Sequence, residues 1–171
     1  MKRVFVLLTA LVLAAGCSES TTAPAADDNR AQFIAQLLTA NEVPPIPNAA
    51  EAAAAGTAHI DFRLTKDAAG AITAATVDFR VDLTGFPATS AITAAHIHTG
   101  AAGASGSVLV SAAVAANEVT LTSGVGTFSR INLTVSAANA QAIINNPAGF
   151  YFNVHTSANP GGVVRGQLVR Q

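Results

Sequence analysis

The chain contains few of the residues on which several common functions depend. Its 171 residues include one cysteine, one tyrosine and no tryptophan, and only 11% of them are charged. A single cysteine cannot form an intramolecular disulfide, so the folded part must be stable without one. The scarcity of Trp and Tyr argues against a surface that stacks on sugar rings. The sequence has no basic cluster, which excludes the usual kind of nucleic-acid-binding surface.

Sequence signatures of catalysis are also missing. No G-x-S-x-G nucleophile elbow occurs in the chain. The ten acidic residues are few and scattered, which disfavours a carboxylate pair of the glycosidase kind. The glycines at 100, 103 and 106 are followed by neither a lysine nor a helix pattern, which argues against a phosphate-binding loop. We therefore predict that the protein is not an enzyme.

The first 17 residues, MKRVFVLLTALVLAAGC, have the organisation of a secretory signal. Two basic residues precede a short apolar stretch over 4–13, which small residues follow. The stretch is too short to span a bilayer as a helix. Residues 14–17 resemble the lipobox of bacterial lipoproteins, although Ala14 stands where leucine is commoner. This resemblance implies that Cys17 is lipidated and becomes the mature N-terminus, the alternative being an ordinary signal with an incidental cysteine.

The rest of the chain divides into a tether over 17–30 and one domain over 31–171. The tether is polar and contains proline, which predicts flexibility, and the domain is long enough for one core. Cleavage before Cys17 would leave 155 residues with seven basic and ten acidic side chains, a mild net charge of −3. We predict a lipid-anchored protein of the bacterial cell envelope, outside the cytoplasm at the outer membrane or cell surface. It would contact the membrane through Cys17 and bind no nucleic acid.

Alternating hydrophobic residues predict that the domain is built from β-strands. Apolar side chains occupy every second position over 75–83, with Thr, Asp and Arg between them. Residues 58–64 alternate in the same way, and the turn-forming TKDAAGA between the two segments predicts an antiparallel hairpin. Further strands are predicted over 32–38, 92–98, 108–110, 119–121, 126–133, 150–155 and 163–169.

One segment has the features of a helix. Ser136 can cap its N-terminus, residues 137–145 are mostly good helix formers, and Pro147 follows as a stop. We expect the alanine-rich stretch 49–55 to be an irregular connection. Many short strands with glycine, proline and asparagine turns, and only one short helix, predict an all-β fold. The expected architecture is an antiparallel immunoglobulin-like β-sandwich or barrel.

Three polar motifs interrupt the strand pattern: LTANEVPPIP at 38–47, AAHIHTG at 94–100 and YFNVHTSANPGGVVRGQL at 151–168. Their order and content resemble the CHRD domain, a module first described in chordin and common in exported bacterial proteins. The resemblance covers nearly the whole chain after the signal and tether. It implies an exported, immunoglobulin-like β fold without established catalytic activity, and it identifies no ligand. The family usually has a glutamate after the NPGG turn, where this chain has Val163.

The histidines of the last two motifs are candidates for a metal site. His96 and His98 are two residues apart on a predicted strand, so both rings lie on one face of the sheet. On the strand over 150–155, Asn153 and His155 share the face opposite the phenylalanines. Three neutral imidazoles from two strands suit copper or zinc. The alternative is that these histidines only make hydrogen bonds within the sheet.

The remaining motif residues have mainly structural interpretations. Glu42 precedes prolines that keep the chain extended, and its carboxylate is expected to pair with Arg165 or to face solvent or a ligand. Asn153 is the candidate to hold the outer ring nitrogens of the histidines, with Glu42 behind it. We predict a non-catalytic binding or structural module of the cell envelope with an unidentified envelope or extracellular ligand. The alternative is a copper- or zinc-binding protein that could be redox-active.

Overall fold

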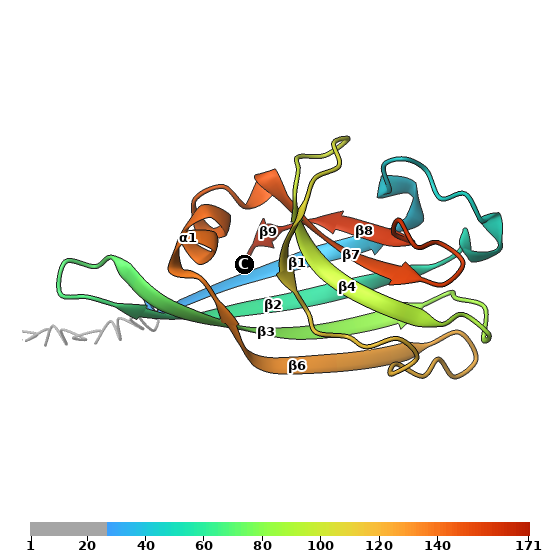
Figure 1. Cartoon of the computed structure of the whole chain (residues 1–171), viewed down its shortest axis with the longest axis horizontal. Helices are drawn as coiled ribbons and strands as arrows, with labels where there is room; N and C mark the ends of the chain where they lie inside the picture. Colours follow the sequence, from blue (N-terminus) through green and yellow to red (C-terminus); the bar gives the residue numbers. More distant parts are fainter. Residues whose placement is uncertain (1–26) are drawn as a thin grey trace, which may run out of the picture.

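Residues 27–171, which the computed structural model describes, form one antiparallel β-sheet and a single α-helix (Figure 1). The sheet order is β5-β4-β7-β8-β1-β2-β3-β6, with β9 paired to β1, and the sheet curls into a nearly closed barrel. This confirms the predicted all-β class. The strands are β1 (Arg30–Leu38), β2 (Ala55–Lys66), β3 (Ile72–Thr84), β4 (Ile92–Thr99), β5 (Val108–Ser111), β6 (Gly126–Val135), β7 (Phe150–Thr156), β8 (Val164–Gln167) and β9 (Val169–Arg170).

The two longest strands, β2 and β3, form the hairpin that their alternating residues predict. Ile60 pairs with Phe79 in the antiparallel ladder, and both side chains are buried in the core. The turn is closed by Asp67, whose Oδ1 accepts hydrogen bonds of 2.9 Å from two backbone amides. Across the barrel, the ring of Phe79 lies 5.5 Å from that of Phe152 on β7. The core therefore joins strands that are distant in the sequence.

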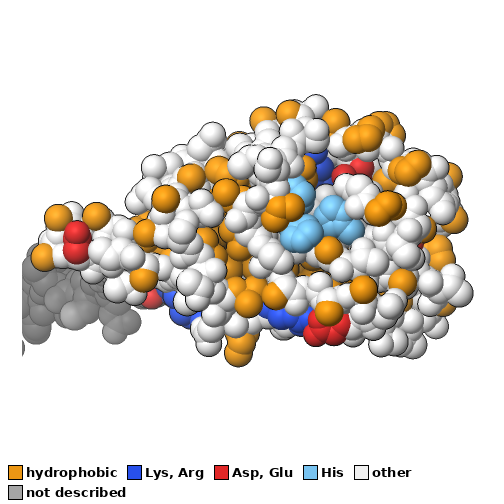
Figure 2. Space-filling view, in the orientation of Figure 1, with side chains coloured by type: hydrophobic (Ala, Val, Ile, Leu, Met, Phe, Trp, Pro, Cys, Tyr) orange, Lys and Arg blue, Asp and Glu red, His pale blue; other side chains and the backbone are white. Residues whose placement is uncertain are grey.

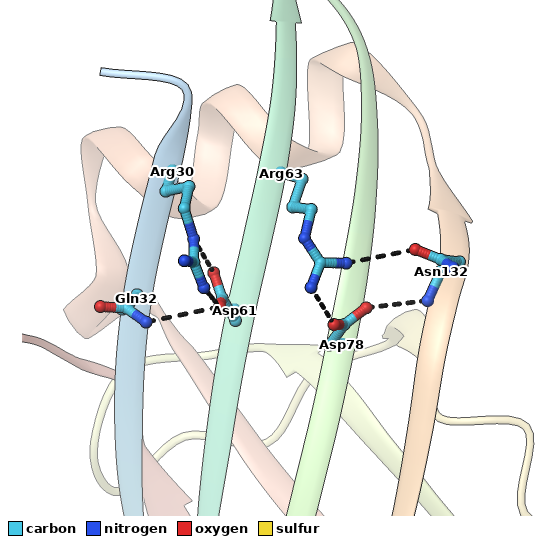
Figure 3. Close-up of polar contacts among 6 residues, drawn as sticks. All are labelled: Arg30, Gln32, Asp61, Arg63, Asp78 and Asn132. Atoms are coloured by element: carbon cyan, nitrogen blue, oxygen red, sulfur yellow. Dashed lines mark hydrogen bonds and ion pairs between the residues drawn. The ribbon is translucent and has the colours of Figure 1, made fainter. Parts of the chain in front are cut away.

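The outer face of β1, β2, β3 and β6 carries a network of charged and amide side chains (Figure 3). Arg63 on β2 forms an ion pair of 2.6 Å with Asp78 on β3, and it donates a hydrogen bond to the Asn132 side chain on β6. Arg30 and Asp61 form a second ion pair between β1 and β2. These pairs are solvent-exposed or partly so, so each contributes little to stability. They mark this face as the solvated side of the sheet.

The helix α1 (Ala137–Asn145) begins and ends where the sequence predicts. The Ser136 hydroxyl caps it by accepting a 3.1 Å hydrogen bond from the Asn139 amide. Its apolar side packs Ala140 and Ile143 into the core. No helix in the described part of the chain is long and apolar enough to cross a membrane.

Two strand predictions differ from the structure. Residues 119–121 do not form a strand; Val119 and Leu121 are buried in the core from an irregular connection. Their alternation therefore reflects packing by a loop and not a ladder of backbone hydrogen bonds. The predicted strand over 163–169 is divided at Leu168 into β8 and β9, which both pair with β1. The predicted signal and the lipidation site at Cys17 lie outside the described residues.

Candidate functional site

The histidine motifs meet on the outer face of three neighbouring strands, β4, β7 and β8. His96 on β4 pairs with Asn153 on β7, which in turn pairs with Arg165 on β8. Two residues further along β4, and on the same face, His98 pairs with Tyr151 on β7. The intervening side chains point the other way, and Ile97 and Phe152 are fully buried in the core. We call the outward side chains the polar face: His96, His98, Tyr151, Asn153, His155 and Arg165.

The three histidines of the polar face, which are the candidate metal ligands, converge in the structure. Each offers one ring nitrogen, and these nitrogens all lie within 4.8 Å of one another. His96 Nδ1 and His155 Nε2 are 3.2 Å apart, and the ring centroids of the trio are separated by 5.1 to 5.9 Å. Two nitrogens that each lie about 2.05 Å from one tetrahedral ion would be about 3.3 Å apart. Figure 2 shows histidine side chains side by side at the surface in this view.

Backbone carbonyls orient two of the three rings. His98 Nδ1 lies 3.0 Å from the Gly106 carbonyl, and His155 Nδ1 lies 2.9 Å from the Pro160 carbonyl. A carbonyl only accepts, so each Nδ1 carries a proton, and in the neutral form of such a ring the lone pair lies on Nε2. For His98 and His155, these carbonyls and not the predicted Asn153 hold the outer ring nitrogen.

Burial favours the uncharged form of two of the histidines, His96 and His155. Burial, together with smaller effects of the neighbouring His155 and His98, lowers the pKa of His96 to about 4. Burial is also the main cause that lowers the pKa of His155, against the opposing effect of the Pro160 carbonyl. Neutral imidazole is the form that binds metal ions, so little proton competition would arise at these two rings near pH 7.

Arg165 is held by stacking and by backbone carbonyls. Its guanidinium carbon lies 3.4 Å from the centroid of the Tyr151 ring, and the same ring stacks on His98 with a centroid separation of 5.0 Å. Its Nη2 donates to the carbonyls of Ala101 and Ala104, at 3.0 and 2.7 Å. Arg165 therefore fixes the loop after β4 against the polar face, and it is only 1% exposed.

Glu42 is buried but does not form the predicted ion pair. Four ion pairs within 4 Å occur among the described residues, and a Glu42–Arg165 pair is not one of them. Burial raises the pKa of Glu42 to about 7, and Arg165 is near enough to oppose that rise. A Cβ atom on Gly162 would lie only 2.7 Å from both Glu42 oxygens and from Asn153 Nδ2. Glycine at 162 therefore lets the carboxyl group approach the polar face.

Unsatisfied polar atoms are concentrated around this face. Buried side-chain atoms without a hydrogen-bond partner in residues 27–171 are Arg130 Nη2 on β6 and four atoms here. Such atoms are rare in folded proteins and require an explanation, such as water or a ligand. One of them, His98 Nε2, is a nitrogen that could bind an ion. The four atoms are Glu42 Oε1, His98 Nε2, Asn153 Oδ1 and Arg165 Nη1.

Sequence reasoning missed a second buried carboxylate, Glu51. It accepts hydrogen bonds from Thr156 Oγ1 at 2.6 Å and Asn159 Nδ2 at 2.7 Å, and it also bonds Ser90. Glu51 thus anchors the 3-10 turn at Ala49–Glu51 to the NPGG turn that carries the Pro160 carbonyl. The alanine-rich sequence around Glu51 does not indicate this role. Two of its hydrogen-bond partners, Thr156 and Asn159, are more than 100 residues away in the sequence.

Comparison with known sequences agrees with the arrangement of the motifs. The profile of the CHRD domain matches residues 33–168, which is most of the chain. The chain belongs to the CHRD domain family. No curated protein and no solved structure shows significant similarity to it.

Membership of the CHRD family suggests a binding or structural module. The departure at Val163 from the usual CHRD glutamate has a structural counterpart. Val163 is fully buried, and its amide donates a 2.8 Å hydrogen bond to the Val154 carbonyl. The position is thus part of the core in this CHRD domain, and the carboxyl groups near the polar face come from Glu42 and Glu51.

Proposed function

We propose that this protein is an exported, lipid-anchored binding module of the cell envelope, and that its CHRD domain binds a transition-metal ion. The signal-like N-terminus and the resemblance of residues 14–17 to a lipobox support the location, and the family suggests a binding or structural module. The observation that carries the metal-binding proposal is the convergence of His96, His98 and His155 within 4.8 Å.

The chemistry of the trio fits copper or zinc. Both ions accept neutral imidazole nitrogens, and zinc sites with three protein ligands leave a fourth position free. The carbonyls of Gly106 and Pro160 supply the outer contacts that metal-bound histidines usually have. The buried His98 Nε2 has no hydrogen-bond partner, and coordination to an ion would use its lone pair.

Metal content after purification without a chelating tag tests the proposal. We expect one copper or zinc ion per chain, measured by elemental analysis and by titration of the chelator-treated protein. The double substitution His96→Ala and His98→Ala should abolish this stoichiometric binding and leave the circular dichroism spectrum of the fold unchanged.

His59→Ala is the matched control, because His59 is exposed on β2 and lies outside the trio. It should bind metal as the wild type does. If the wild type takes up no stoichiometric copper or zinc, or if the double variant binds as much, the histidines serve only as hydrogen-bonding residues of the sheet. The anchoring part of the proposal would be unaffected by either result.

A further inference from the structure

An ion on the three histidines would have only neutral ligands. The convergent group found among the described residues consists of three imidazoles and contains no carboxylate or thiolate. Imidazole is neutral when it binds, so a divalent ion would keep both of its positive charges. A charge in a partly buried site is costly unless another charge or a polar group compensates it. This inference rests on the proposed metal site.

The surroundings of the trio add positive charge. Arg165 stacks on Tyr151, which stacks on His98, and a guanidinium is protonated at every relevant pH. The buried Glu42 does not belong to the convergent group, and its carboxyl lies against Gly162 and Asn153. No carboxylate of the described residues is therefore placed to neutralise the ion by coordination.

The site is accessible from one side. His98 and His155 are only 8% and 9% exposed, whereas His96 is more exposed than either. The Nδ1 atoms of the two buried rings are bonded to backbone carbonyls, so the more exposed His96 marks the side of the site that faces solvent. Three ligands leave a tetrahedral ion one vacant position, and solvent reaches it past His96. We propose that the ion takes a small anion from solution at this fourth position, and that the anion balances its charge.

Titration of the copper(II)-loaded protein with sodium azide tests this proposal. Azide is a small coordinating anion, and its binding to copper(II) gives a charge-transfer absorption band. We expect the band to saturate at one azide per copper. Sodium perchlorate at the same ionic strength should not produce it, because perchlorate coordinates weakly.

A variant pair isolates the role of charge. Ala94 lies on the same face as His96 and pairs with His155, and it is partly exposed, so a larger side chain can be accommodated. Ala94→Asp would place a carboxylate beside the ion, and Ala94→Asn would place a neutral group of the same shape there. A single charge within about 5–6 Å should weaken azide binding at least tenfold in Ala94→Asp relative to Ala94→Asn.

The outcomes separate the two proposals. Equal azide affinities in the two Ala94 variants would refute charge balance as the reason for anion binding. Stoichiometric copper without any azide band in the wild type would show that the fourth position is closed, and would overturn the anion proposal while leaving the metal site intact. A wild type that binds no copper would overturn both. The wild-type titration decides the question even if Ala94→Asp folds poorly.

Discussion

Replacing Glu42 by Gln should change the pH dependence of stability in a defined direction. Burial raises the pKa of this carboxyl from 4.5 to about 7 in the folded protein. Between these two values the folded state binds more protons than the unfolded state, so stability falls as the pH rises. The stabilising effect of the protonated carboxyl is complete below about pH 4.5 and is lost as the pH rises through 7. Glutamine is neutral throughout and removes this dependence.

The magnitude follows from the size of the pKa change. A shift of about 2.5 units corresponds to about 3 kcal/mol at 1.36 kcal/mol per unit. Only 6% of Glu42 is exposed, so solvent screening reduces this value little. Ionisation of Glu42 should therefore lower the unfolding free energy of the wild type by about 3 kcal/mol at pH 8 and by less than about 1 kcal/mol at pH 5. The reference is the protein at low pH, where the carboxyl is protonated in both states. Relative to the wild type, the unfolding free energy of Glu42→Gln should rise by about 2–3 kcal/mol from pH 5 to pH 8.

Urea unfolding at fixed ionic strength, with a chelator present, measures this difference. The histidines contribute equally to both proteins, so their titration cancels in the comparison. Glu118→Gln is the control, because Glu118 is exposed and its pKa is lowered by the hydrogen bond from the Ala115 amide. Glu118 should remain ionised in both states between pH 5 and 8, and its variant should show no such rise. Parallel pH profiles for Glu42→Gln and the wild type would refute the reasoning.

Other consequences of the structure can be tested singly. Phe79→Ala should cost about 3–5 kcal/mol of unfolding free energy, because the ring is 1% exposed and packs on Phe152; a loss below about 1 kcal/mol in urea unfolding would contradict the core position. Cys17→Ser should move the protein from the membrane fraction to the soluble fraction of fractionated cells, and unchanged membrane association would refute the lipid anchor.

The strands and the helix were predictable where local pattern and tertiary environment agree. Strict alternation over 75–83 predicts β3 because one side of that strand packs in the core along its whole length. The same pattern misleads at Val119 and Leu121. There the backbone is irregular although both side chains are buried. Alternation of apolar residues indicates which side chains are buried, and it does not show whether the backbone forms a hydrogen-bonded ladder.

The candidate site was predictable only in part. The spacing of His96 and His98 fixes their common face, because side chains alternate along a strand. The position of His155 beside them depends on the pairing of β4 with β7. A connection of 50 residues that contains β5, β6 and α1 separates these two strands in the sequence. The Gly106 and Pro160 carbonyls could not be predicted, since any residue type supplies a carbonyl. Their position depends on the path of the backbone alone.

The placement of buried polar groups in this domain is consistent with the proposed binding site. The inward side chains of β4 and β7, such as Ile97 and Phe152, already form a continuous apolar core. Burying Glu42, Asn153 and Arg165 on the opposite face adds a desolvation cost, and each of the three retains an atom without a partner. Well-packed apolar residues of similar volume are often as stabilising as buried polar groups, or more so. A sheet that keeps costly polar atoms next to three convergent imidazoles is better explained by what that face binds than by the stability of the barrel.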